Sequence, residues 1–438
     1  MEYLDYLKTI LNDEEINLLE EAYNKEGLNG LRVNLLKTNE DKISEYFSFT
    51  KKHPFVKEAF IYDNNIRPGK DPLFSAGAYY IQEPSAMMPA FLLEINENDR
   101  VLDLCAAPGG KSSQILSKLN NTGILVSNDI SNKRAMILSE NIERMGAKNA
   151  FVLNDEIDNI ESKFYGFFDK VVLDAPCSGM GMFRKNKEVK DDWTLNKALS
   201  LSETNKKLIL QAYNCLKEGG VMVYSTCTFT KEEDEDVISY LLDNTNASIV
   251  KIFNDDSFYP SSVEGAIRLY PFKFEGEGHF ICLIKCNDVH DSRIKKGNKY
   301  ATNREINLYR EFERENLNIK LEGYFIKMGD DLHYLKEDYF SLDRLRVIRN
   351  GVHLGTIKKD RFEPNHAFAM SLKKEEVKRY VSYDHLSNEA DDYLKGMTLE
   401  TKNNKGYVLV CINDISVGWG KDDGRIIKNL YPKGLRVN

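Results

Sequence analysis

The sequence of 438 residues lacks any apolar run as long as the roughly 18 residues that a membrane-spanning helix needs. Its amino terminus mixes acidic residues into the apolar positions and has no basic segment followed by an apolar core, so we expect no secretory signal there. Its seven cysteines form no CxxC pair and are too scattered for a disulfide framework. The sequence therefore predicts a cytoplasmic protein with no membrane partner and no metal site, in which any special cysteine is a reactive one.

An excess of positive charge is also missing. The chain holds 60 Lys/Arg against 68 Asp/Glu, a net charge of −8, which argues against indiscriminate binding to nucleic acid. The charge is uneven, however: residues 1–290 hold 32 basic and 45 acidic residues, whereas residues 291–438 hold 28 and 23. The carboxyl-terminal third is either a basic module that touches an anionic polymer or a surface of merely different composition.

The length suggests two or three domains. Residues 1–95 mix two helical segments, at 3–12 and 13–24, with a strand at 31–37, which is typical of a small α+β domain. Residues 96–287 alternate apolar runs with helical stretches, a pattern that predicts an α/β domain with a doubly wound sheet. Residues 288–303 are polar and aperiodic, as in a linker, and residues 304–438 favour short strands and turns. Seven sheet strands are predicted in the α/β domain, at 100–105, 123–129, 150–155, 168–176, 219–227, 248–253 and 279–286.

Two hairpins are predicted in the last domain. Asn350-Gly351 lies between alternating runs at 344–357, and this dipeptide is a strong hairpin signal. A second hairpin is expected at 407–420, with its turn near Asn413-Asp414.

The string LDLCAAPGGKSSQI at 102–115 ends the first predicted parallel strand and opens a helix. In doubly wound sheets, ligands bind outside the carboxyl ends of the strands, where small residues let the backbone approach them. A phosphate-binding P-loop would need glycine where Cys105 stands, which weakens the alternative of an NTPase, and the GxGxxG spacing of dinucleotide sites is missing. The loop suits a smaller cofactor with a ribose and an amino-acid tail.

Acidic residues end the next two predicted strands. Asp129 could accept hydrogen bonds from both ribose hydroxyls, and Asp155 would lie near an adenine amino group. Each aspartate alone would more simply be a helix N-cap, but acids in register after successive strands favour a ligand site.

Cys177, in DAPCSGMGMF (174–183), and Cys227, in YSTCTF (224–229), follow the fourth and fifth strands and should meet at the edge of the sheet that carries the cofactor loop. Helix N-termini there could lower the pKa of a thiol and make it a nucleophile. Other cysteines are interpreted as small buried hydrophobic residues: Cys215, Cys282, Cys286 and Cys411.

Together, DLCAAPGGKSSQ, DAPCSG and YSTCTF resemble the RNA 5-methylcytosine methyltransferases of the Sun/RsmB/RsmF family. RVNLLK (32–37) and YYIQEPSAMMP (79–89) look like the region ahead of the catalytic domain in that family. Residues 351–370 are similar to the carboxyl-terminal part of RsmF/YebU-type enzymes, which methylate small-subunit ribosomal RNA and carry a PUA-like module. The resemblance implies a Rossmann-like class I methyltransferase domain that uses S-adenosylmethionine, followed by a mainly β, PUA-like RNA-binding domain.

The resemblance also implies roles for single residues. Cys227 would be the nucleophile and Cys177 would help to release the product, although DNA cytosine methyltransferases suggest the opposite assignment, with the nucleophile in a Pro-Cys pair such as Pro176-Cys177. Asp174 would hydrogen-bond the target base, and Glu156 is an alternative to its neighbour Asp155. The implied cofactor pocket is Cys105, Ala106, Ala107, Pro108, Gly109, Gly110, Lys111, Asp129, Asp155 and Asp174.

The expected function is methylation of cytidine carbon 5 in RNA, with 16S rRNA or the small ribosomal subunit as the expected substrate. Methylation of tRNA or another RNA, and an inactive RNA-binding assembly factor, are the alternatives. Thr230 and Glu233 have the spacing of a helix capping box, a structural role. A basic segment is expected to hold RNA, with a solvated strand face as the alternative: Arg344, Arg346, Arg349, Lys358, Lys359 and Arg361.

Overall fold

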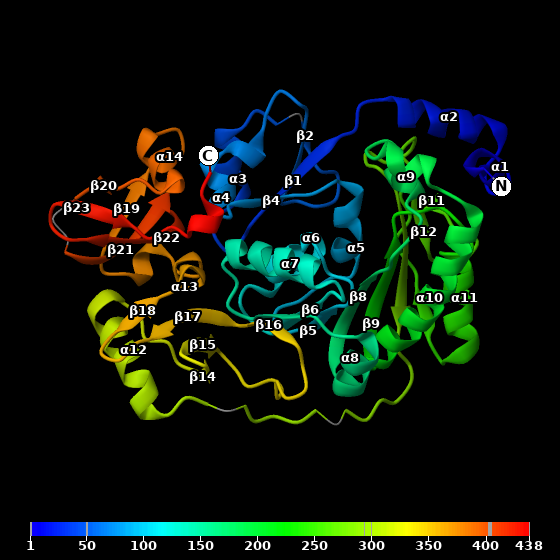
Figure 1. Ribbon diagram of the computed structural model, residues 1–438. Coiled ribbons are helices and arrows are strands. Elements are labelled where there is room, and N and C mark those ends of the chain that lie inside the picture. Colours follow the sequence, from blue (N-terminus) through cyan, green and yellow to red (C-terminus); the bar gives the residue numbers. More distant parts are fainter. Residues whose placement is uncertain (1, 50, 293, 299, 402–404, 438) are drawn as a thin grey trace.

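The computed structural model describes residues 2–49, 51–292, 294–298, 300–401 and 405–437. Figure 1 shows a large central sheet with the amino-terminal sheet above it and the carboxyl-terminal sheets at the opposite end of the molecule from α1 and α2. In these described ranges, no helix is both long enough and apolar enough to cross a membrane.

The amino-terminal region is built on a four-stranded antiparallel sheet of order β2-β3-β1-β4. The predicted strand at 31–37 is observed as Asn29–Val33, and the second predicted helix begins after Asn12, whose side chain forms a capping box with Glu15. The elements of this region are α1 (Tyr3–Leu7), α2 (Asp13–Asn24), β1 (Asn29–Val33), α3 (Glu40–Tyr46), β2 (Lys51–Lys52), β3 (Ala59–Tyr62), η1 (Pro68–Lys70), α4 (Pro72–Ser75), β4 (Tyr79–Ile81), η2 (Ser85–Met87) and α5 (Met88–Leu92).

Helices α1 and α2 do not pack on that sheet. Their apolar side chains, such as Tyr6 and Leu19, share a core cluster with Phe183, Trp193 and Phe229 of the central region. The first 24 residues therefore pack against the central region near α9, β11 and β12, as Figure 1 also shows.

The central sheet has ten strands in the described chain, and the seven predicted strands form most of it. Five run parallel in the order β7-β6-β5-β8-β9, and β13 joins β9 antiparallel. Apolar runs such as residues 124–128 are buried on both faces, as parallel strands covered by helices require. The strands are β5 (Arg100–Asp103), β6 (Ile124–Asn128), β7 (Ala150–Leu153), β8 (Phe168–Asp174), β9 (Leu216–Thr226), β10 (Ser248–Val250), β11 (Tyr259–Pro260), β12 (Ile267–Leu269), β13 (His279–Lys285) and β16 (Val347–Asn350).

Helices cover both faces of this sheet. Two large clusters of buried apolar side chains fill the two sides of the sheet. One contains Phe151 and Tyr224, and the other contains Leu125 and Val152. The helices are α6 (Gly110–Leu119), α7 (Asn132–Met145), α8 (Ile157–Phe164), η3 (Met180–Met182), α9 (Lys187–Asp191), α10 (Leu195–Asn214) and α11 (Glu235–Asn244).

The carboxyl-terminal region is mainly β, as predicted, and contains two further sheets, of order β14-β15-β17-β18 and β19-β21-β22-β23-β20. Its elements are α12 (Asn303–Asn316), β14 (Tyr324–Met328), β15 (Asp331–Leu335), β17 (Val352–Ile357), β18 (Phe362–Pro364), α13 (His366–Met370), η4 (Lys374–Glu376), β19 (Tyr380–Tyr383), α14 (Asn388–Lys395), β20 (Leu399–Glu400), β21 (Gly406–Ile412), β22 (Ile415–Asp422), β23 (Ile426–Asn429) and η5 (Lys433–Leu435).

The two predicted hairpins have different outcomes. The second is confirmed, because β21 pairs with β22 around Asn413 and Asp414, both at positive φ. The first is wrong: the chain does turn at Asn350-Gly351, and Gly351 has a φ of +67°, but β16 pairs antiparallel with β7 of the central sheet while β17 pairs with β15. A segment from beyond residue 303 therefore forms one edge of the central sheet.

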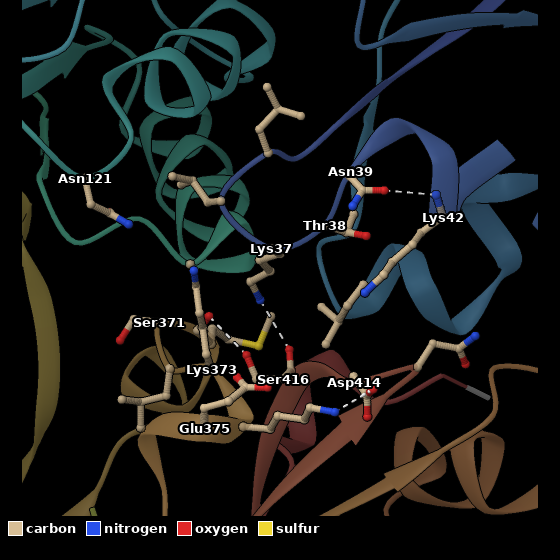
Figure 2. Close-up of a pocket in the computed structure, with 18 of the residues that line it drawn as sticks. Lys37, Thr38, Asn39, Lys42, Asn121, Ser371, Lys373, Glu375, Asp414 and Ser416 are labelled. Atoms are coloured by element: carbon tan, nitrogen blue, oxygen red, sulfur yellow. Dashed lines mark hydrogen bonds and ion pairs between the residues drawn. The ribbon is translucent and has the colours of Figure 1, made fainter. Parts of the chain in front are cut away.

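The three regions meet around a cavity of about 410 Å³ (Figure 2). Lys37 lies at this junction, and its Nζ donates hydrogen bonds to the carbonyl oxygens of Ala76 (2.8 Å) and Ser416 (3.2 Å). Burial lowers the pKa of Lys37 to about 7. Asn121 and Gly146, which also line the cavity, follow the ends of α6 and α7, so this junction lies at the amino ends of the parallel strands, away from the cofactor loop.

Candidate active site

The predicted cofactor loop connects β5 to α6. Its backbone is fixed by hydrogen bonds from Leu104 N to Val172 O (3.0 Å) and from Ala106 N to Asn128 O (2.9 Å). Gly109 caps α6 with a φ of +110°, a conformation that favours glycine. The turn from Cys105 to Gly110 thus carries little side-chain bulk at the carboxyl ends of the central strands.

Two buried polar residues support the loop from below. Arg32, on β1, is fully buried and donates to Gly110 O (3.0 Å) and Ser113 Oγ (2.7 Å) at the start of α6. Asp103 accepts a hydrogen bond from Ser112 Oγ (2.7 Å), while its second oxygen has no partner among the described residues. Burial raises the pKa of Asp103 to about 7. The amino-terminal region thus helps to shape the site.

Asp129 lies at the end of β6, nearly buried at 3% exposure. One carboxylate oxygen accepts from Ser131 N (2.9 Å), and the other lies 3.4 Å from Arg134 Nη2. Arg134 also donates to Ala107 O (2.7 Å), so it connects the acid to the cofactor loop. The N-cap of α7 is Ser131. Asp129 is therefore not the helix N-cap that was the alternative to a ligand-binding role.

Asp155 lies at the end of β7, and its carboxylate is held by donors from two directions. Asn159 Nδ2 donates to one oxygen (2.9 Å), and Arg346 N donates to the other (2.7 Å). Glu156, the alternative acid, is the N-cap of α8. Asp155 and Asp129 therefore lie at neighbouring strand ends, as the sequence predicted.

Asp174, at the end of β8, is half-buried and forms an ion pair with the buried Lys111 of α6, with 2.7 Å between Nζ and Oδ2. Ser225 Oγ donates to its other oxygen (2.7 Å). Burial alone would raise the pKa of Asp174, but the Lys111 ammonium and the hydrogen bonds hold that pKa below its ordinary value. Asp174 is consequently a carboxylate that can accept hydrogen bonds at neutral pH.

The two cysteines meet beside this ion pair. The sulfur atoms of Cys177 and Cys227 lie 2.9 Å apart, and Cys227 N donates to Cys177 Sγ (3.2 Å). The hydrogen bond with Cys227 and burial both raise the pKa of Cys177 well above its ordinary value. The expectation that helix N-termini lower the pKa is therefore wrong for Cys177, which stays a thiol and can donate a hydrogen bond to the Cys227 sulfur. Cysteines 215, 282, 286 and 411 are buried, as expected.

Glu233 was predicted to cap a helix, and that prediction is wrong. Its fully buried carboxylate accepts hydrogen bonds from Ser178 N (2.7 Å) and Ser178 Oγ (2.6 Å), and α11 begins only at Glu235. Ser178 is the neighbour of Cys177, so Glu233 holds the loop that carries this cysteine. The spacing from Thr230 suited a cap, and nothing local in the sequence indicated that the acid would be buried.

The basic segment expected to hold RNA is divided. Arg349 is buried, ion-paired to Glu143 and donating to Ser139 Oγ (3.2 Å), so its place in an RNA surface is a correction to the sequence analysis. Arg346 contacts Asp155. The remaining four lie on the surface: Arg344, Lys358, Lys359 and Arg361.

Among the residues that the structure describes, no group of three or more His, Cys, Asp or Glu side chains is arranged to hold a metal ion. Residues that sequence reasoning missed are Arg134, Asn159, Ser225 and Glu233. Ser225 could have been found, because it lies two residues before Cys227 on the strand beside Asp174.

Family comparisons match consecutive parts of the chain. The N-terminal domain of 16S rRNA methyltransferase RsmF matches residues 1–84, and 16S rRNA methyltransferase RsmB/F matches residues 90–285. The RsmF rRNA methyltransferase first C-terminal domain matches residues 311–372, and the methyltransferase RsmF PUA domain matches residues 381–437. The region 304–438, expected as one domain, is thus matched in two parts.

Curated relatives named ribosomal RNA small subunit methyltransferase F are similar along most of the chain. The protein of Vibrio vulnificus (strain YJ016) is 32% identical over 467 residues, covering 99% of this chain and 96% of the relative. That of Shewanella oneidensis is 31% identical over 430 residues, covering 92% of this chain and 90% of the relative.

Solved structures share the fold of about two thirds of the chain. A methyltransferase homolog protein from Pyrococcus horikoshii is 30% identical, with a TM-score of 0.56, and the match covers 62% of this chain and 91% of that one. NSun6 from Pyrococcus horikoshii, solved with SFG, is 22% identical with a TM-score of 0.59, covering 66% of this chain and 98% of that one.

Proposed function

Because this chain belongs to the family of 16S rRNA methyltransferases of the RsmF type, we propose that it methylates carbon 5 of cytidine in 16S ribosomal RNA. S-adenosylmethionine is the methyl donor. The observation that carries the proposal is the Cys177–Cys227 pair, whose sulfur atoms lie 2.9 Å apart at the sheet edge that also holds Asp174 and Lys111. Two sulfur atoms beside a hydrogen-bonding carboxylate suit the covalent chemistry of a pyrimidine ring.

The residues of the cofactor loop fit such a donor. The turn from Cys105 to Gly110 has little side-chain bulk, and the nearly buried carboxylates of Asp129 and Asp155 follow the next two strands. Carboxylates at these strand ends can accept hydrogen bonds from ribose hydroxyls and from an adenine amino group. The unpartnered oxygen of Asp103 adds a buried acceptor beneath the loop. When bound, the donor supplies an electrophilic methyl group.

Cys227 carries the nucleophilic step. Its thiolate adds to carbon 6 of cytosine, and the new carbon–sulfur bond pushes electron density to carbon 5, which then takes up the methyl group. The Asp174 carboxylate accepts a hydrogen bond from the amino edge of the base, and Lys111 fixes its orientation from 2.7 Å. The Cys177 thiol donates to the Cys227 sulfur before the attack and so stabilises the thiolate.

The proton on carbon 5 must leave before the carbon–sulfur bond can break, and we assign its removal to Cys177, directly or through a water molecule. The pKa of Cys177 is raised first by its hydrogen bond with Cys227. Once the Cys227 sulfur is bonded to carbon it is a neutral thioether, so that cause weakens and Cys177 can lose its proton to solvent. The thiolate then accepts the carbon 5 proton, and the bond electrons return to the Cys227 sulfur as it leaves.

The RNA is proposed to contact the exposed cations of the carboxyl-terminal region. Lys358 and Lys359 are exposed and follow β17, and Arg361 pairs with Asp360 (3.3 Å) and Glu363 (2.7 Å). The target cytidine has to be unpaired or drawn out of its stack to reach Cys227.

Bisulfite mapping of 16S rRNA from cells with and without the gene tests the function. We expect one or more cytidines to lose their methylation in the deletion and to regain it on complementation with wild type but not with Cys227→Ala. RNA carrying 5-fluorocytidine should trap a covalent complex, because fluorine cannot leave as a proton does. Unchanged methylation in the deletion, together with modification of tRNA by the purified protein, would redirect the substrate assignment.

A further inference from the structure

A segment of the carboxyl-terminal region reaches the proposed cofactor pocket. Strand β16 pairs with β7, and Arg346, the residue before β16, lies opposite the end of β7 where Asp155 stands. Arg346 N donates to Asp155 Oδ2 (2.7 Å), and Arg346 Nε lies 3.4 Å from Oδ1. The Arg346 side chain is 62% exposed, whereas the Asp155 side chain is only 4% exposed. The contact therefore joins a surface cation to an acid inside the pocket.

Further hydrogen bonds fix the strand end in place. Asn154 N donates to Arg346 O (2.9 Å), which extends the β7–β16 ladder by one step. The Asn154 side chain donates to Asp129 O and Ile130 O (both 2.9 Å), and Asn128 Oδ1 accepts from Asp155 N (2.9 Å). The backbones that carry Asp129 and Asp155 are thus bonded to each other and to Arg346.

The carboxylate of Asp155 has about four acceptor positions. Three are directed to donors of the protein: Asn159 Nδ2 at 2.9 Å, Arg346 N and Arg346 Nε. A carboxylate with three fixed donors cannot rotate freely, so its remaining lone pair has a set direction. One acceptor position is left for a donor from a ligand.

We propose that Arg346, together with Asn159, is a positioning residue for the cofactor, and that it orients the Asp155 carboxylate toward the 6-amino group of adenine. The inference rests on the proposed function, since it takes Asp155 as part of the S-adenosylmethionine pocket. It replaces the expectation that Arg346 binds RNA, and it makes the region beyond the linker a part of the cofactor site.

The test compares two ligands by calorimetry with the full-length protein: S-adenosylhomocysteine, and S-inosylhomocysteine, which lacks the 6-amino group. Arg346→Ala should weaken S-adenosylhomocysteine binding about fivefold, the usual effect of losing one hydrogen bond. Its effect on S-inosylhomocysteine should be less than about twofold by the same reasoning. Arg346→Lys should restore part of the loss, and in turnover assays the KM for S-adenosylmethionine should rise while the KM for RNA stays unchanged.

Lys163→Ala is the matched control, because Lys163 Nζ donates to Asp343 O (3.1 Å) in the same segment without touching Asp155. It should leave the binding of both ligands unchanged. Equal weakening of both ligands by Arg346→Ala, or no weakening of either, would overturn the proposal, as would a loss confined to RNA affinity. If the wild type bound neither ligand, the proposed function itself would fail, which is a distinct result.

Discussion

Cys177 and Cys227 hold their sulfur atoms 2.9 Å apart although 50 positions separate them in the chain. They meet because β8 and β9 run parallel and adjacent, with Asp174 paired to Ser225, so the loops that follow the two strands leave the sheet at the same edge. At this separation, charge on one sulfur opposes ionisation of the other. The pair is therefore expected to work as one thiolate and one thiol.

The two cysteines should fail in different ways when replaced. Cys227→Ala is expected to abolish both the covalent RNA adduct and turnover, because no sulfur then adds to carbon 6. Cys177→Ala should still form the adduct but lower turnover by about 10²–10⁴-fold, the usual contribution of a positioned proton acceptor. Methyl incorporation and denaturing gels of protein–RNA complexes measure the two effects. An adduct that persists in Cys227→Ala and vanishes in Cys177→Ala would invert the assignment.

Glu233 should affect catalysis without touching the cofactor. Its carboxylate anchors Ser178 through bonds of 2.7 and 2.6 Å, so Glu233→Ala frees the loop that carries Cys177. We expect kcat to fall about tenfold or more, the size of one lost hydrogen bond to a charged group, while the KM for S-adenosylmethionine is unchanged. Glu233→Gln, which keeps one acceptor oxygen, should have a kcat between those of the wild type and the alanine variant. A normal kcat in the alanine variant would show that Ser178 needs no anchor.

Asp103 should make the stability of the free protein depend on pH. Burial raises its pKa from 3.8 to about 7, so between these values the folded protein holds a proton that the unfolded chain has released. For an acid shifted upward, this penalty is absent below pH 4, grows as pH rises and is complete above pH 7. Asp103→Asn should unfold like wild type near pH 4 but be about 2–4 kcal/mol more stable at pH 8, since one pKa unit is worth about 1.4 kcal/mol.

Denaturant unfolding at both pH values, without cofactor, measures this difference. The comparison uses the difference between variant and wild type, so the titration of all other groups cancels. Equal stability differences at the two pH values would mean that folding does not raise the pKa of Asp103.

Substitution of Arg349 should affect stability, whereas substitution of the exposed lysines should affect RNA binding. Arg349→Ala leaves Glu143 without its buried partner and should destabilise the protein by about 2–4 kcal/mol. The double variant Lys358→Glu, Lys359→Glu should leave stability unchanged but weaken RNA binding. The slope of log affinity against log salt concentration should become shallower by an amount that corresponds to about two phosphate contacts. Unfolding curves and RNA binding at several salt concentrations measure the two effects. An unchanged salt slope in the double variant would move the RNA surface elsewhere.

Much of the central sheet could be predicted because its strands are continuous apolar runs, and the location of the cysteines followed from parallel strands alone. Asp129, Asp155 and Asp174 lie at strand ends for the same reason. The wrong predictions depended on partners distant in sequence. Asn350-Gly351 does form a turn, but the sequence could not reveal that β16 would pair with β7 rather than with β17.

The wrong predictions for Arg349 and Glu233 also depended on partners that are distant in sequence. Arg349 follows Arg344 and Arg346 in the sequence, yet helix α7 packs against β16 and supplies Glu143, with which Arg349 forms an ion pair. Glu233 has the spacing of a cap, but its carboxylate accepts hydrogen bonds from Ser178, in the loop of Cys177, and from Thr230 Oγ1. Local spacing describes a residue's neighbours in the chain, whereas burial depends on which element packs on top.

The outermost parallel strand, β7, has its free side covered by β16. An uncovered strand offers a row of unpaired amide and carbonyl groups that can template pairing with another molecule. A protein shortened to its first 300 residues would expose that row. The carboxyl-terminal region that is expected to bind ribosomal RNA therefore also covers a strand edge that would otherwise be open to pairing with a second molecule.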